Sequence, residues 1–209
     1  MTPAEPSPRL IDQSTTLRRF TAMDAAVFAD INHDPLNVEW AGSDATMSVE
    51  RAADLIAGPI AQGWADGHLL RFAIEEEYDG GTHVVGTLSL QDVSPLAQGG
   101  TASLGIKLLA SGRGRGAASR GVGLAIKFAF EELGLSDLHW RTSVGNASSR
   151  ALAERHGFVL AATIPAFGHR SGILTEGWML VLNRHQLPAV KPVVPRLSDG
   201  EVLLRELRS

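Results

Sequence analysis

One short glycine-rich stretch limits the folds that this chain can adopt. Residues 111–121 read SGRGRGAASRG, with four glycines and three arginines. An alternating, strand-like segment ends directly before it at residue 109, and an amphipathic helical pattern begins directly after it at residue 122. A flexible linker is also rich in glycine and serine, but here there is no gap for a linker to span. The stretch therefore predicts a strand-to-helix turn, whose free amides at the helix start favour an anion.

Three other motifs share this composition, and each lacks a required part. An RGG-type nucleic-acid segment repeats and contains aromatic residues, whereas this stretch is a single copy without them. Gly112, Gly114 and Ala117 fit the GxGxxA pattern of a dinucleotide fold, but the next strand ends in SVGN at residues 143–146, without the acidic residue that would hold a ribose. A P-loop needs GK[ST], which does not follow. The remaining interpretation is a turn that binds a pyrophosphate.

The charge distribution supports a compact polyanionic ligand. The chain has 19 basic and 23 acidic residues, and its net charge of −4 argues against a general affinity for nucleic acid or an anionic membrane. No acidic residue occurs between residues 93 and 130, and this window contains Lys107, Arg113, Arg115, Arg120 and Lys127. We expect the three arginines of the turn to add positive charge for phosphate groups.

The composition also excludes several kinds of chemistry. The chain has no cysteine, which rules out disulfides, a thiolate nucleophile, a cysteine-type zinc site and an acyl-cysteine intermediate. We predict no metal site. The first ten residues, MTPAEPSPRL, lack the pattern of a signal peptide, and there is no apolar run of 18 residues. We therefore expect a cytoplasmic protein of one main domain that does not bind membranes.

Periodicity predicts helices first and then an antiparallel run of strands. A short strand over 16–20 precedes a helix over 21–31, which Thr21 and Asp24 open as a capping box. A second helix starts at Ser48 and is interrupted at Gly58-Pro59, and the intervening segment 33–46 resembles a loop. Strands are expected over 69–77, 82–93 and 101–109.

The segments after the turn predict one βαβ unit. The helix over 122–133 leads to a strand over 138–144, which we expect to pair in parallel with 101–109. A helix over 147–155, capped by Asn146, and strands over 158–164 and 173–183 complete the domain. We predict a flexible leader over 1–14, the domain over 15–186, and a Pro-rich linker with an extra strand over 187–209. That extra strand could repeat the opening strand, pair with a partner chain or begin a further domain.

Two motifs at a fixed distance resemble a known family. Residues 113–118, RGRGAA, fit the acyl-CoA motif [QR]xxGx[GA], and residues 146–158 read NASSRALAERHGF. Together they resemble the Gcn5-related N-acetyltransferase (GNAT) superfamily, in particular its branch that acetylates the N-termini of ribosomal proteins (RimJ/RimL-like). The resemblance implies an α+β fold with αβα layers, a mostly antiparallel, V-splayed central sheet and one βαβ unit at the CoA site.

The same resemblance implies the site residues. Backbone groups near Leu108 would bind the pantetheine arm and stabilise the oxyanion. The pyrophosphate would be held by Arg113, Gly114, Arg115, Gly116, Ala117, Ala118 and Ser119. Asn146 would reach the pantetheine or the acceptor. Ser149 would act as general acid or bind the leaving thiolate, although an ordinary first-turn helix serine is an equal alternative.

Two departures from the family pattern leave the catalytic proton transfers open. The only tyrosine, Tyr78, is predicted to lie far from the site, and no glutamate precedes Gly105. His139, His169 and Glu176 are candidate bases, and none is preferred.

The function that we expect is transfer of an acetyl group from acetyl-CoA, as co-substrate, to a primary amine on a small molecule or a peptide N-terminus. The alternatives are a non-catalytic CoA-binding module and a larger donor such as succinyl-CoA. The loop with His33, Asp34 and Trp40 would contribute to the acceptor site, and a homodimer is possible.

Overall fold

The computed structural model describes residues 8–96 and 99–186, and it contains a single eight-stranded sheet. The sheet order is β1-β2-β3-β4-β5-β6-β8-β7, and only β5 and β6 pair in parallel. The strands span Leu10–Asp12 (β1), Thr15–Arg19 (β2), Leu69–Tyr78 (β3), Gly81–Leu96 (β4), Gly99–Leu108 (β5), Asp137–Ser143 (β6), Val159–Arg170 (β7) and Ile173–Asn183 (β8). The predicted antiparallel run and the single βαβ unit are confirmed.

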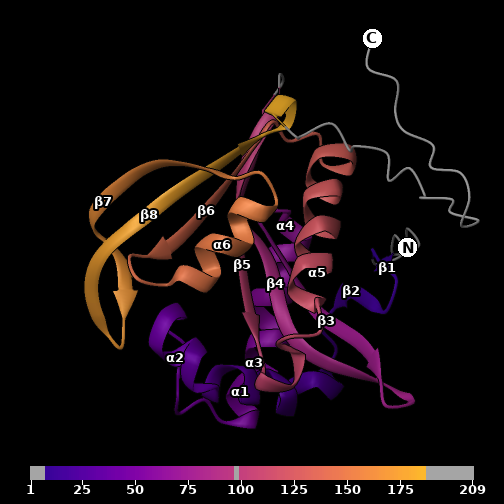
Figure 1. Ribbon diagram of the computed structural model, residues 1–209. Coiled ribbons are helices and arrows are strands. Elements are labelled where there is room, and N and C mark those ends of the chain that lie inside the picture. Colours follow the sequence, from indigo (N-terminus) through magenta and orange to yellow (C-terminus); the bar gives the residue numbers. More distant parts are fainter. Residues whose placement is uncertain (1–7, 97–98, 187–209) are drawn as a thin grey trace, which may run out of the picture.

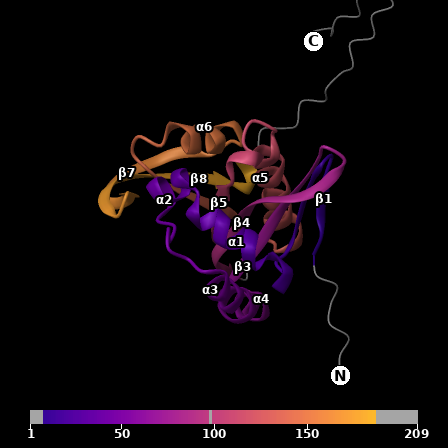
Figure 2. The same ribbon diagram turned by 90° about the horizontal axis from the view of Figure 1, so that it is seen from below.

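Helices cover both faces of the sheet and make three layers. In Figure 2, α5 and α6 lie on one side of the sheet, and α3 and α4 lie on the other. The helices span Ala25–His33 (α1), Pro35–Ala41 (α2), Val49–Leu55 (α3), Ala61–Asp66 (α4), Ala117–Lys127 (α5) and Ala147–Arg155 (α6). No helix of the described part is long and apolar enough to cross a membrane.

Alternation along β3 explains why both layers adhere to the sheet. Phe72 belongs to the larger core cluster, which includes Ala125 of α5 and Leu152 of α6. Its neighbour Ala73 belongs to a second cluster with Phe28 of α1. Because successive side chains of a strand point to opposite faces, one strand supplies both cores. The predicted layered α+β fold is confirmed.

The sheet opens into a V between β5 and β6. These strands pair only from Thr101 opposite Asp137 to Leu104 opposite Trp140. Beyond that point β5 continues along β4 as far as Leu108, whereas β6 follows β8. Figure 1 shows the two strands together at the top of the view and apart at the bottom. The expected splayed sheet is therefore present.

The chain joins the sheet earlier than the sequence suggested. Residues 10–12, which lie in the expected leader over 1–14, form β1 and pair antiparallel with β2. Leu10 packs against the large core, and this apolar contact holds the short strand on the sheet. The leader prediction is wrong for these residues. Residues 1–7 and the predicted linker and extra strand over 187–209 lie outside the described residues.

The segment predicted as a loop over 33–46 contains helix α2. The Asp34 carboxylate accepts hydrogen bonds from the amides of Leu36 (3.1 Å) and Asn37 (3.3 Å), so it caps the helix start. Pro35 occupies the first helical position, where no amide is needed, and Gly42 ends the helix with φ of +59°. The loop prediction missed these start and stop signals.

The predicted interruption at Gly58-Pro59 does not break the second helix. A π-helical turn over Ile56–Ile60 connects α3 to α4. The wider turn tolerates the missing amide of Pro59, and it keeps Ile56 and Ile60 buried at 6% exposure each. Burial of these two side chains thus prevails over the local cost of the proline.

Candidate active site

A cleft of about 660 Å³ occupies the opening between β5 and β6. Helix α2 borders it on one side of the sheet, and the start of α5 and one side of α6 border it on the other. The residues that line the cleft come from both faces of the sheet, and they include Asn37, Trp40, Arg71, Ser89, Asp92, Gly105, Lys107, Leu108, Arg113, Gly114, Ala118, Trp140, Arg141, Asn146 and Ser149.

The glycine-rich turn forms one mouth of this cleft. Gly112 is buried, and a Cβ atom there would lie 2.7 Å from Cβ of Val85, so only glycine fits without a shift. Gly116 precedes α5 with φ of +82°. The first hydrogen bond inside α5 runs from the amide of Arg120 to the Gly116 carbonyl (3.0 Å). The amides of residues 117–119 therefore lie ahead of the helical hydrogen-bond ladder, as in an anion site.

Two of the three arginines of the turn already have contacts within the protein. Arg113 lines the cleft, but its guanidinium bonds to the Asp34 carboxylate and to the Leu108 carbonyl (2.7 Å). Arg115 stacks on the ring of Tyr78, 4.2 Å from its centroid.

Arg120 forms an ion pair with a buried carboxylate of the protein. Its Nη2 lies 2.6 Å from Oε1 of Glu76, and its Nε donates to the Thr15 hydroxyl at 2.7 Å. The expectation that Arg120 adds charge for a phosphate is wrong, because Glu76 already neutralises the guanidinium.

Backbone groups of β5 face the opening. The amide of Leu109 donates to the Val85 carbonyl on β4 (2.8 Å), and pairing alternates along an antiparallel strand, so the amide of Leu108 points away from β4. The Leu108 carbonyl already accepts from Arg113 (2.7 Å) and from Asn37 (3.1 Å). Its amide is therefore the group available to a ligand.

Ser149 and Asn146 lie at the far wall of the cleft, where α6 begins. The Asn146 side chain accepts from the amide of Ser149 (3.1 Å), so the predicted cap of this helix is present. The Ser149 hydroxyl accepts from Nε1 of the buried Trp140 at 3.0 Å. Because this bond uses a lone pair of the oxygen, the hydroxyl proton of Ser149 is left to donate.

Comparison with known proteins identifies the family. The acetyltransferase (GNAT) domain profile matches residues 15–159. The chain belongs to the GNAT acetyltransferase family. The family predicted from the two motifs, and with it the class of an acyl-CoA-dependent N-acyltransferase, is thereby confirmed. No curated protein sequence matches the chain.

Solved structures of GNAT proteins share this fold at low sequence identity. RimJ of Mycobacterium smegmatis, in complex with CoA-disulfide, is 22% identical with a TM-score of 0.74, over 88% of this chain and 89% of that one. RimL, a ribosomal L7/L12 α-N-protein acetyltransferase in complex with CoA, is 17% identical (TM-score 0.72; 84% and 98% covered). Spermidine N-acetyltransferase of Vibrio cholerae, in complex with CoA and spermine, is 17% identical with a TM-score of 0.71, over 84% of this chain and 98% of that one.

Several residues predicted for this GNAT site do not line the cleft. Arg115, Gly116, Ala117 and Ser119 lie outside its lining, and of these Ala117 is fully buried in the core. The Ser119 hydroxyl is bonded to Nε2 of His156 (2.9 Å). Burial, and to a smaller extent Arg155, lowers the pKa of His156.

The candidate bases also lie outside the cleft of this GNAT domain. His139, His169 and Glu176 are absent from its lining among the described residues. Trp40, which was expected near the acceptor, does line the cleft. Asp34 instead caps α2 and binds Arg113.

Two cationic side chains in the cleft were missed from the sequence as site residues. Arg71 of β3 and Lys107 of β5 both contribute to its lining. Burial, and then the charge of Arg71, lowers the pKa of Lys107 to about 8, and burial also lowers the pKa of Arg71. The signal available was the alternation in the strands, which puts Arg71, Ser89 and Lys107 on one face and apolar residues on the other.

Proposed function

We propose that this protein transfers an acetyl group from acetyl-CoA to a primary amine by direct attack in a ternary complex. The observation that carries the proposal is the continuity of one cleft. It runs from the glycine-rich turn at the start of α5, along the unpaired end of β5, to Ser149. A pyrophosphate at the turn and a thioester near Leu108 would lie along this single path.

The chain's own groups suggest a role for each part of the reaction. The amides at the start of α5 would bind the pyrophosphate, and backbone groups of residues 106–108 would bind the pantetheine arm as an added strand does. The Leu108 amide would stabilise the oxyanion that forms when the amine attacks the acyl carbon. Arg113 and Asn37 hold the Leu108 carbonyl, so the peptide that carries this amide is already oriented.

Collapse of the tetrahedral intermediate breaks the carbon–sulfur bond and releases the thiolate of CoA. The Ser149 hydroxyl would donate a hydrogen bond to that sulfur. Its proton is free to do so, because in the bond with Trp140 the serine oxygen is the acceptor. The attacking amine loses its proton to water, since the candidate bases lie outside the cleft lining. Positioning and the oxyanion amide would then provide most of the rate enhancement.

The donor and the acceptor are tested together by thiol release. Acetyl-CoA and succinyl-CoA would each be mixed with a panel of amino acids, peptides and polyamines. We expect acceptor-dependent release of CoA above the rate of hydrolysis. Absence of stimulation by any acceptor with either donor would contradict the proposal and favour a non-catalytic CoA-binding module.

Two substitutions test the assigned roles. Gly114→Asp should weaken CoA binding, because Gly114 lines the cleft just before α5, with positive φ (+75°) and open space around it, and the substitution adds a carboxylate beside the proposed pyrophosphate site. Gly134→Asp is a matched control, since Gly134 also has positive φ (+66°) and open space around it but lies at the far end of that helix. Ser149→Ala should lower kcat with little effect on CoA affinity, whereas Ser94→Ala, on the exposed part of β4, should not. Unchanged kcat would remove Ser149 from the mechanism.

A cytoplasmic location and a homodimer are part of the same proposal. The absence of cysteine is consistent with a reducing compartment. Light scattering on the full chain and on a chain ending at Leu187 tests whether the C-terminal segment mediates dimerisation. Equal molar masses would count against that role.

A further inference from the structure

One face of the central sheet is polar where the cleft crosses it. In the register of the sheet, Arg71 lies opposite Ser89, and Ser89 lies opposite Gly105. Lys107 is two residues beyond Gly105 on β5, so its side chain is on the same face. Gly105 has no side chain, and the Gln91 amide, which donates to the Ser89 hydroxyl at 2.7 Å, lies over it. Helix α2 borders the cleft on this side, with Asn37 and Trp40.

Neither cation of this face has an acidic partner. Among residues 8–96 and 99–186, no carboxylate lies within 4.0 Å of Arg71 or Lys107, and Nε of Arg71 is buried without any hydrogen-bond partner. Lys107 donates one hydrogen bond, to the Ser43 hydroxyl (2.7 Å). Among the described residues, Asp92 is the acidic residue that lines the cleft, and it is exposed to solvent. The cleft thus holds two positive groups that the described residues leave unneutralised.

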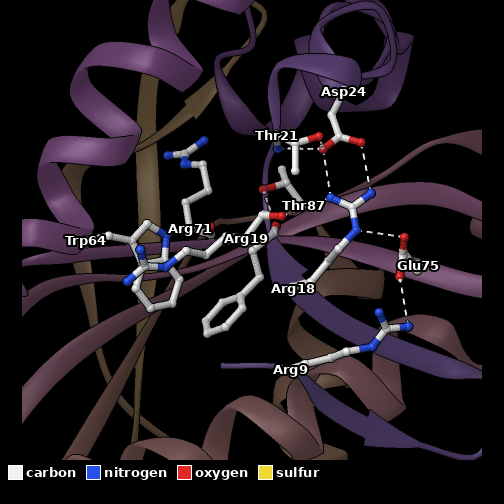
Figure 3. A network of polar contacts seen from close by, with 10 residues as sticks. Arg9, Arg18, Arg19, Thr21, Asp24, Trp64, Arg71, Glu75 and Thr87 are labelled. Carbon is white, nitrogen blue, oxygen red and sulfur yellow. Dashed lines mark hydrogen bonds and ion pairs between the residues drawn. The ribbon is translucent and has the colours of Figure 1, made fainter. Parts of the chain in front are cut away.

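Other enclosed arginines of the fold have a partner within the protein, and for Arg19, whose Nε is also buried without a hydrogen-bond partner, it is the Trp64 ring, 4.2 Å from the guanidinium carbon. Arg18 lies 2.7 Å from both Asp24 and Glu75. Arg120 has Glu76 at 2.6 Å. Figure 3 shows that the Arg71 side chain extends away from the Arg18 network, and none of the interactions drawn there reaches its guanidinium. Among the described residues, Arg71 differs from these three because its guanidinium has neither a carboxylate nor an aromatic ring as partner, and this leaves it available to an external anion.

Two enclosed cations in proximity are unfavourable unless an anion joins them. Each charge loses hydration, and the charges repel each other, which is the reason that burial and Arg71 together depress the pKa of Lys107. An anion between the two would offset both costs, and a guanidinium binds carboxylate or phosphate in a fork geometry. A cationic acceptor would instead add a third positive charge.

We propose that Arg71 and Lys107 form an anion site for the acceptor, so that the preferred substrates are amines which also carry a carboxylate or phosphate group. This inference rests on the proposed function, since it assigns the acceptor of that reaction. The acceptor is favoured over the donor because these side chains lie on the α2 side of the sheet. The glycine-rich turn, with its pyrophosphate site, is at the start of α5 on the other side.

Matched acceptor pairs test the proposal with acetyl-CoA as donor. The pairs are dipeptides with a free carboxylate against their C-terminal amides, Asp- against Asn-containing dipeptides, and phosphoethanolamine against ethanolamine. We expect at least one pair to show tenfold or higher kcat/KM for the anionic member. Spermidine should be a poor acceptor. Equal rates within every pair, or spermidine as the best substrate, would overturn the proposal.

Substitutions of Arg71 and Lys107 test whether these two side chains cause the preference for anionic acceptors. Arg71→Gln and Lys107→Gln should remove the preference for the anionic member mainly through KM, while the affinity for CoA stays unchanged. Arg51→Gln and Lys127→Gln are exposed controls and should retain the preference. If Arg71→Gln instead impairs only succinyl-CoA with neutral amines, the anion belongs to the acyl chain and the acceptor assignment is wrong.

A binding measurement separates this site from the proposed function. Inorganic phosphate would be titrated into the CoA-saturated protein and into the Arg71→Gln/Lys107→Gln double variant, with calorimetry as the readout. Binding to the first and loss of binding in the second supports the anion site even if no amine is acetylated. A different result would separate the two proposals. If amines are acetylated, but phosphate binds equally to both proteins and anionic acceptors react no faster than neutral ones, the anion site fails and the proposed function stands.

Discussion

Replacing Lys107 by methionine should stabilise the protein while it weakens acceptor binding. Lys107 is enclosed in the cleft beside Arg71, and its pKa falls from 10.5 to about 8. This difference of about 2.5 pKa units corresponds to about 3 kcal/mol, at about 1.36 kcal/mol for each unit. That value is the cost, in unfolding free energy at pH 7, of keeping the ammonium group charged in the folded protein.

The expected net gain in unfolding free energy is smaller than this cost of charging Lys107. Lys107 keeps partial access to solvent, and methionine loses the hydrogen bond to Ser43, which contributes about 1 kcal/mol. We therefore expect Lys107→Met to raise the unfolding free energy by about 1–2 kcal/mol at pH 7. For a domain of this size, the melting temperature should rise by about 2–8 °C.

The pH dependence provides the distinctive signature. Because the folded pKa is depressed, the unfolded chain binds more protons between about pH 8 and 10.5, and stability of the unsubstituted protein rises with pH over this window. The difference in unfolding free energy between Lys107→Met and the unsubstituted protein should therefore shrink as the pH rises. Urea unfolding at pH 7 and at pH 9.5 measures it, with Lys127→Met on the exposed side of α5 as control. A destabilised Lys107→Met variant whose difference from the parent protein does not change with pH would refute this reasoning.

Three further substitutions test how the glycine-rich turn is held. Glu76→Gln leaves the guanidinium of Arg120 without its carboxylate, and we expect a loss of about 3–5 kcal/mol in urea unfolding, against almost none for the exposed Glu131→Gln. Gly112→Ala places a Cβ 2.7 Å from that of Val85, so CoA affinity measured by calorimetry should fall, and Val85→Gly in the same chain, which removes that Cβ, should restore part of it; no restoration would contradict the steric cause. Asp34→Ala removes the cap of α2, at about 1 kcal/mol, together with the partner of Arg113. Its melting temperature should fall and KM for the acceptor should rise, and an unchanged KM would indicate that α2 does not shape the acceptor side.

The elements that could be predicted from the sequence are those with a local signal. The turn between β3 and β4 was indicated by YDGG, and the structure has positive φ at Asp79 (+52°) and Gly80 (+76°) as a tight hairpin requires. The apolar alternation of β3 to β5 and the helical period of α5 were equally clear. The parallel pairing of β5 with β6 followed from the helix that connects them.

The elements that were missed depend on contacts between distant residues. Helix α2 has a start signal in Asp34-Pro35, but its seven residues are too few for a convincing period. The π-helical turn at Pro59 persists because Ile56 and Ile60 are buried, which local propensity does not reveal. Arg120 was assigned to a phosphate because its partner, Glu76, is 44 residues away in the sequence.

The candidate site likewise contains residues that the sequence could predict and residues that it could not. The glycine-rich turn and the Asn146 cap have sequence motifs, so their positions were predicted. Arg71 and Lys107 have none, because their meaning comes from the register of three strands and from the absence of an acidic neighbour among the described residues. A charged side chain in an otherwise alternating strand is thus a useful indicator of a site on the polar face.

The short pairing between β5 and β6 has a consequence for folding cooperativity. Only four residue pairs join the two halves of the sheet along this seam. We therefore expect the free protein to open there in native-state hydrogen exchange, with β6, β7 and β8 exchanging as one unit ahead of global unfolding. A ligand that forms strand-like hydrogen bonds in the gap would complete the seam. Saturation with CoA should then merge the two units, and the whole domain should exchange as one.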